Sequence, residues 1–198
     1  MNFDTIFASA ATSLGDQLKM IAKLIAGRSA LGNNRQIFFC QVSGYDTHQV
    51  QLSSHASLMT ELSNALKAFY DTTVALGVDG AVTTFTMSDF NRTFTPNGTD
   101  TTGGSDHAWG GHAIAMGGSV FGKKLYGAFP SLKLGTNNDT DKNRGRWIPT
   151  TSVDQYSAVL AKWFGVDSNS MSAIFPNLPR FDDPLTSSTA NLNFMNLA

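Results

Sequence analysis

The apolar positions along the chain predict alternating helices and strands. In residues 12–25 the apolar side chains recur at helical spacing and form the single stripe of an amphipathic helix. The bounded apolar run 37–42 is typical of a buried strand. A longer helical pattern covers 52–76, and the Val- and Thr-rich stretch 81–87 favours a second strand. The order strand, helix, strand therefore predicts a parallel βαβ unit with a right-handed crossover.

The second half of the chain shows a weaker pattern. Two short apolar segments within 114–121 predict either one bent strand or two short ones, because paired glycines separate them. Residues 134–147 are polar and predict a long connection or flap. Ser152 and Gln155 have the spacing of a capping box, which predicts a last helix. We interpret 184–198 as a tail or a segment that wraps an edge, and the whole chain as a single α/β domain.

Composition and charge narrow the classes of protein. Of the 198 residues 41% are hydrophobic and 15% are charged, which fits a globular domain with a core rather than a disordered chain. A net charge of −1 gives no indication of nucleic-acid or anionic-membrane binding. No apolar stretch is long enough to span a bilayer, and the N-terminus lacks the cationic segment of a signal peptide. Cys40 is the single cysteine, so no internal disulfide can form.

Two clusters of Asp and His carry the candidate chemistry. Asp46 and His48 follow the first predicted strand, and Asp106 and His107 lie in a later glycine-rich stretch. Carboxylate and imidazole ligands together suit Zn²⁺, Mn²⁺ or Fe. Because the C-terminal ends of parallel strands meet at one edge of a sheet, we expect all four side chains to share one cleft. The alternative is that adjacent Asp and His residues cap turns and helix starts.

Three further residues extend this hypothesis. His112 either reaches the same ion or caps the next element. Arg92 follows the second predicted strand, and its planar guanidinium suits a phosphate, sulfate or carboxylate group. Asp89 would be a ligand, a partner in a salt bridge with Arg92, or the residue that orients Arg92 or a histidine. No serine lies in a G-x-S-x-G elbow, so the sequence indicates no nucleophile.

Four segments together resemble a known family. They are GYDTH at 44–48, SDFNRT at 88–93 with PNGT following, GSDHAWGGH at 104–112, and VDQYSAVLAKWFG at 153–165. This combination resembles the uncharacterised bacterial domain-of-unknown-function family 1501, which is placed in the alkaline phosphatase/sulfatase superfamily. The resemblance implies a three-layer α/β/α sandwich around a mostly parallel sheet. It also implies a periplasmic or other extracytoplasmic setting.

The resemblance assigns roles to residues of this chain. Asp46, His48, Asp106 and His107 match the family's ligands for divalent metal, which would be Zn, Mn or Ca, and Arg92 matches its arginine. Asn91 and Ala108 stand where the family pattern has glycine. Family members usually have a longer N-terminal half, so the chain resembles a C-terminal portion. We therefore expect either the missing half, a homodimer or the tail to cover the sheet.

Two functions from different classes stay open on the sequence. The first is a metal-dependent hydrolase of phosphate or sulfate esters, with a small anionic ester as substrate and Arg92 holding its anionic group. The second is a non-catalytic binding or structural protein that keeps the fold.

Overall fold

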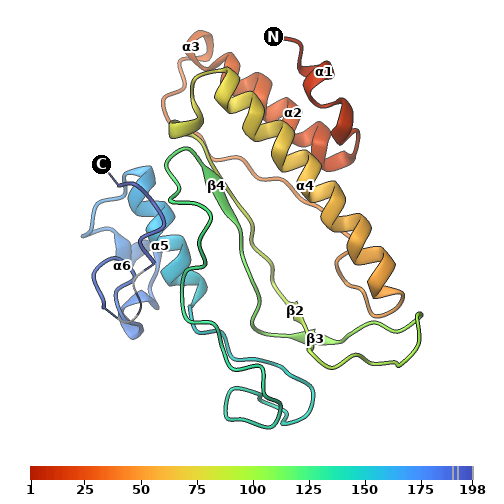
Figure 1. Cartoon of the computed structure of the whole chain (residues 1–198). Helices are drawn as coiled ribbons and strands as arrows, with labels where there is room; N and C mark the ends of the chain where they lie inside the picture. Colours follow the sequence, from red (N-terminus) through yellow and green to blue (C-terminus); the bar gives the residue numbers. More distant parts are fainter. Residues whose placement is uncertain (189, 191, 198) are drawn as a thin grey trace. The chain divides into compact units, whose positions relative to one another are not determined.

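The computed structural model describes residues 1–188, 190 and 192–197, and its chain forms two compact units (Figure 1). Unit 1 comprises Met1–Val82 and Pro96–Asp106. Unit 2 comprises Thr83–Thr95 and His107–Ala198. Each unit has a hydrophobic core of its own. No helix in the described residues has both the length and the apolar character needed to cross a membrane.

Unit 1 is helical, and its two main helices confirm the predictions for 12–25 and 52–76. Thr12 caps the first of them, since its Oγ1 accepts the Gly15 N–H at 3.2 Å. The elements are α1 (Phe3–Ile6), η1 (Ala8–Ala10), α2 (Ser13–Ala26), α3 (Arg28–Leu31), α4 (Gln51–Ala75) and η2 (Asp79–Ala81).

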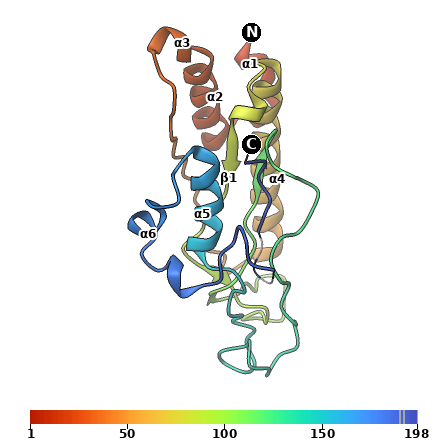
Figure 2. The ribbon, with the colours of Figure 1, turned by 90° about the vertical axis from the view of Figure 1, so that its left-hand side faces the viewer.

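The core of unit 1 lies where α2 packs along α4 (Figures 1 and 2). The buried side chains of α2 repeat at helical spacing, and the facing side of α4 is rich in small residues. Ala65 is fully buried there, and small side chains allow two helix backbones to approach closely. At the start of α2, a Cβ on Gly15 would overlap the carbonyl oxygen of Ala10, so η1 also packs directly on α2. The core side chains are Phe7, Ala10, Leu14, Leu18, Ala22, Ile25, Ala65, Ala68, Phe69 and Val78.

The apolar run 37–42 is not a strand, and the prediction of a buried strand there is wrong. The segment is extended but pairs with no other strand in the described part of the chain. Phe38 packs against the core, whereas Ile37 is 80% exposed and Phe39 is 87% exposed. The backbone of Gln41 bonds to the side chain of Gln17. The Gln17 amide donates to the Gln41 carbonyl at 3.0 Å and accepts the Gln41 N–H at 3.0 Å. One face of the run is therefore covered, and the other is open.

Unit 2 contains the strands, and they are short and antiparallel. Thr83 pairs with Gly117 in one two-stranded sheet, and Arg92 pairs with His107 in the other. The elements are β1 (Thr83–Phe85), β2 (Asn91–Arg92), β3 (His107–Ala108), β4 (Ala115–Gly117), α5 (Val153–Phe164), α6 (Met171–Ile174) and η3 (Leu178–Arg180).

These pairings contradict the predicted three-layer α/β/α sandwich with a mostly parallel sheet. The described strands form two separate antiparallel sheets of two strands each, and each strand is two or three residues long. The βαβ unit is absent from the described residues because 37–42 forms no ladder, and 81–87 narrows to β1, which pairs with β4 instead. A hydrophobic run of six residues cannot become a buried strand without a partner for its backbone groups.

The core of unit 2 lies between α5 and the C-terminal segment (Figure 2). The predicted capping box is present, because Ser152 Oγ accepts the Gln155 N–H at 3.1 Å and Gln155 Oε1 accepts the Ser152 N–H at 2.9 Å. Val159 is fully buried against a cluster that includes Phe194. The predicted tail 184–198 therefore contributes to the core, although residues 189, 191 and 198 lie outside the described residues.

We predict that Gly15→Ala destabilises the protein. Alanine is intrinsically favoured over glycine in a helix by up to about 1 kcal/mol, but its Cβ would overlap the Ala10 carbonyl oxygen. We expect the free energy of unfolding to fall by about 1–3 kcal/mol, measured by urea denaturation. Gly80→Ala is the matched control, because a Cβ there meets no atom within 4 Å. An unchanged or increased stability of Gly15→Ala would contradict the predicted overlap.

Candidate functional site

The turn that carries Asp46 and His48 is held to α4 by Tyr45. Its hydroxyl donates to the Leu58 carbonyl at 3.3 Å, and its ring meets His55 edge-on with centroids 6.4 Å apart. Thr47 is buried between Asp46 and His48, which are both exposed. The two exposed side chains project together, since His48 Nε2 lies 3.0 Å from Asp46 Oδ1. The chain Asp-Thr-His thus presents a carboxylate and an imidazole to the same side of the turn.

Burial of Thr47 leaves a polar atom without a partner. Its Oγ1 is buried and has no hydrogen-bond partner in the described part of the chain. Such an unsatisfied hydroxyl costs free energy, and native structures contain few of them. The turn is therefore held in place by its surroundings rather than by its own most favourable hydrogen bonding.

Asn97 clamps the second loop of unit 1 against this turn. Its side-chain amide donates to the His48 carbonyl at 2.9 Å and to Asp106 Oδ1 at 3.3 Å. Its Oδ1 accepts the Gly104 N–H at 2.9 Å, and its own N–H donates to the Gly104 carbonyl at 2.9 Å. One asparagine thereby closes the loop 97–104 and fixes the residues that follow it.

Glycine at 104 permits the closest approach between the two loops. A Cβ there would overlap the Thr47 carbonyl oxygen and the backbone of His48. Directly after it, the Ser105 N–H donates to that same Thr47 oxygen at 3.3 Å. Gln49 and Gly103 form an antiparallel bridge beside this contact. These backbone contacts therefore hold Asp106 next to His48.

The result is an imidazole placed between two carboxylates. His48 Nε2 lies 3.0 Å from Asp46 Oδ1, and His48 Nδ1 lies 3.4 Å from Asp106 Oδ1. A neutral imidazole has one N–H and can donate to only one of them, whereas the protonated ring can donate to both. All three side chains are partly exposed, so this cluster is reached by solvent and by ions.

The donor set fits a transition-metal ion on one side of the ring. Two ligands of one tetrahedral Zn²⁺ lie about 3.4 Å apart, given bond lengths of about 2.0–2.2 Å. The 3.0 Å separation between His48 Nε2 and Asp46 Oδ1 is close to that value. Asp106 faces the opposite ring nitrogen, in the position of a carboxylate that orients a metal-bound histidine. Mixed nitrogen and oxygen donors suit Zn²⁺ or Mn²⁺ better than Ca²⁺, which takes oxygen ligands.

The other predicted site residues belong to unit 2. His107 stacks on Phe90, with ring centroids 4.3 Å apart and planes within 7°. The Arg92 guanidinium lies 5.6 Å from the centroid of the same Phe90 ring. Phe90 thus holds both residues, a role that the sequence analysis missed. His112 lies against Phe129 at 5.6 Å, and Asp89 is exposed.

Asp139 organises the polar loop 134–147 of unit 2 and was also missed. Its Oδ1 accepts the N–H groups of Gly145 and Arg146 at 3.1 Å each, and its side chain is buried. Burial opposes ionisation, but these N–H groups and that of Gly135 outweigh it and hold the pKa of Asp139 below its ordinary value. Arg146 in turn donates from Nε to the His107 carbonyl at 2.9 Å. The repeated short polar residues around Asp139 were the available signal.

A small helical and loop-rich protein with an Asp–His–Asp cluster is the class that these features define. A family described as "Protein of unknown function (DUF1501)" matches residues 6–168. The chain belongs to this family, which confirms the resemblance at family level. Comparisons with curated proteins and with solved structures found no match. The placement in the alkaline phosphatase/sulfatase superfamily stays a prediction.

We predict that Gly104→Ala separates the two loops of unit 1. A methyl group at 104 would overlap the backbone of Thr47 and His48, so the loops must move apart. We expect the His48 imidazole resonances to shift in NMR spectra and the free energy of unfolding to fall by about 1–3 kcal/mol. Gly122→Ala is the control, since a Cβ there meets one atom at 4.0 Å. Unchanged His48 resonances in Gly104→Ala would contradict this role for Gly104.

We predict that Asp139 stabilises unit 2 in a pH-dependent way. Its folded pKa lies below its ordinary value of about 3.8, so the ionised group adds stability above that pH. The contribution is lost as the pH falls through the folded pKa. Asp139→Asn should therefore lower the melting temperature near pH 6, and the difference from the unsubstituted protein should shrink near pH 3. Asp89→Asn, at an exposed position, is the control. A difference of equal size at both pH values would refute the prediction.

Proposed function

We propose that the chain binds a divalent transition-metal ion at the Asp46–His48–Asp106 cluster and uses it to hydrolyse phosphate or sulfate esters. The observation that carries the proposal is the imidazole of His48 between two carboxylate oxygens, at 3.0 Å and 3.4 Å. His48 Nε2 and Asp46 would hold the ion. Asp106 would hold the other ring nitrogen and keep the ring in the orientation that binds metal.

Two costly structural features around the cluster favour a metal-binding role over a purely structural ion pair. Partly exposed ion pairs contribute only about 0–1 kcal/mol to stability. The same loops nevertheless contain a buried hydroxyl without a partner at Thr47 and a position where only glycine fits, Gly104. The unpaired hydroxyl costs free energy, and position 104 accepts only glycine. Both features accompany a fixed placement of three side chains, and metal binding requires such a placement.

A bound ion would polarise an ester oxygen and activate a water molecule. In this chain Asp46 and His48 supply the ion's ligands, and Asn97 holds Asp106 through its donated bond at 3.3 Å. The assignments of His107 and His112 as further ligands, and of Arg92 and Asp89 to the anionic group, stay predictions from the sequence. So does the extracytoplasmic setting.

A non-catalytic metal-binding protein is the second candidate. The favouring observation is that both ring nitrogens of His48 already face carboxylates, an arrangement that suits an ion held for structure. The metal site is common to both candidates, so turnover separates them.

We predict that the protein binds Zn²⁺ or Mn²⁺ stoichiometrically and that His48→Ala abolishes this binding. Loss of an orienting carboxylate typically lowers metal affinity by about 10–100-fold, so Asp106→Asn should weaken binding by that factor. Elemental analysis after dialysis measures both effects. Asp71→Asn is the matched control for Asp106→Asn, because Asp71 lies further along α4 and pairs with Lys67 at 2.6 Å.

The same samples are assayed with p-nitrophenyl phosphate and p-nitrophenyl sulfate. Metal-dependent hydrolysis that His48→Ala removes supports the hydrolase. Stoichiometric metal without hydrolysis of either ester supports the non-catalytic candidate. No metal above the level of His48→Ala would refute both.

A further inference from the structure

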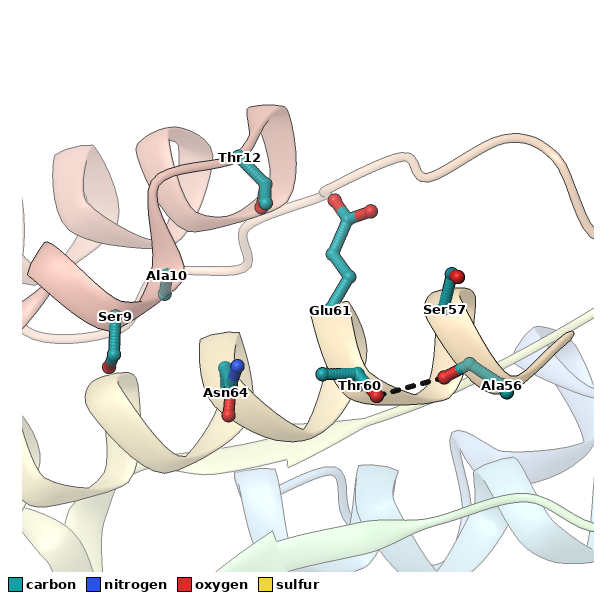
Figure 3. A pocket seen from close by; sticks show the side chains of 8 residues that line it. All are labelled: Ser9, Ala10, Thr12, Ala56, Ser57, Thr60, Glu61 and Asn64. Carbon is teal, nitrogen blue, oxygen red and sulfur yellow. Dashed lines mark hydrogen bonds between the residues drawn. The ribbon is translucent and has the colours of Figure 1, made fainter. Parts of the chain in front are cut away.

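Unit 1 contains a cavity of about 500 Å³ that lies apart from the Asp–His–Asp cluster in sequence and in its lining residues. It opens between α4 and the stretch formed by η1 and Thr12 (Figure 3). Its polar side chains come from both walls, and they are Ser9, Thr12, Ser57, Thr60, Glu61 and Asn64. The cavity is large enough for a small organic molecule.

Two hydroxyls of the α4 wall have their protons engaged. Thr60 Oγ1 donates to the Ala56 carbonyl at 2.9 Å, and Ser57 Oγ donates to the Ser53 carbonyl at 3.2 Å. A hydroxyl whose proton is used in this way keeps only its lone pairs for another partner. Both residues therefore offer hydrogen-bond acceptors rather than donors to a molecule in the cavity.

Glu61 supplies the charge. It extends from α4 toward the wall that Thr12 forms (Figure 3). Among the cavity's lining residues in the described part of the chain, it is the single ionisable one. An ionised carboxylate accepts hydrogen bonds and donates none.

Thr12 completes the opposite wall. Its Oγ1 already accepts the Gly15 N–H at 3.2 Å as the cap of α2. That bond uses one lone pair and leaves the hydroxyl proton and a second lone pair. Asn64 has both donor and acceptor atoms and so adapts to either kind of ligand. Acceptors and one negative charge thus predominate in the cavity, which selects a cationic ligand rich in donors.

We propose that this cavity binds a small primary ammonium compound, with the ammonium group at Glu61. An ammonium has three N–H donors and no acceptor, which complements the carboxylate and the Ser57 and Thr60 oxygens. A phosphate, sulfate or carboxylate would meet like charge and unused acceptors in the same place. The proposal is independent of the metal-site function, because none of the cavity's residues belongs to that cluster.

The probe is 1,4-diaminobutane, and 1,4-butanediol is its uncharged counterpart of equal length. Glu61 is the only glutamate in the sequence, so protein made with carboxyl-¹³C glutamate in a cell-free reaction gives one glutamate carboxyl resonance. We expect the diamine to shift this resonance in a saturable way. The diol should leave it unshifted at the same concentration. Chelator present throughout keeps the result separate from any metal site.

Substitutions identify the group responsible. Glu61→Gln keeps the shape and removes the charge, so diamine affinity, followed by amide NMR shifts, should fall roughly tenfold or more. Thr60→Val removes one acceptor and should produce a smaller loss. Asp71→Asn is the control, since Asp71 lies on the same helix and pairs with Lys67 at 2.6 Å outside the cavity. Equal binding of the diol, unchanged affinity in Glu61→Gln, or an equal loss in Asp71→Asn would overturn the proposal.

Discussion

The backbone contact between Gly104 and the turn Thr47–His48 is the constraint on which the candidate site depends. Any side chain at 104 would occupy the space of the Thr47 carbonyl oxygen, which then accepts the Ser105 N–H. Asn97 holds the same loop from the other side through bonds to His48 and Gly104. With the backbone fixed in this way, Asp106 reaches His48 without support from a sheet. The loops themselves provide the framework that a parallel sheet was expected to provide.

Helix α4 connects this site with the rest of unit 1. Ala65 and Ala68 pack it against α2. The Leu58 carbonyl accepts a hydrogen bond from the hydroxyl of Tyr45, the residue before Asp46. Glu61, one turn before Ala65 on the same face, lines the cavity together with Thr60. One long helix therefore stabilises the core, anchors the candidate metal site and lines a second candidate binding site. A substitution in the buried face of α4 can therefore affect the core, the candidate metal site and the cavity together.

The sequence indicated the helices and part of the site, for identifiable reasons. Helical periodicity and caps are local properties, so α2 and α4 were predicted close to their observed bounds, and α5 begins at the predicted capping box. Asp46 and His48 were predicted to act together because both follow the same predicted strand and offer a carboxylate and an imidazole. Their proximity to Asp106 was expected as well, but from a parallel sheet that the described residues do not form.

The local chemistry of this chain was thus determined by its sequence, namely which segments become helices and which side chains could bind an ion. Tertiary structure alone decided which of them meet. Strand pairing depends on a partner elsewhere in the chain, and 37–42 has the composition of a buried strand but no strand beside it in the described residues. The clamp of Asn97, the ring of Phe90 between predicted site residues and the cavity wall that Thr12 forms opposite Glu61 likewise arise from contacts between distant segments. Such contacts depend on backbone paths through loops, which carry no periodic signal that a single sequence can reveal.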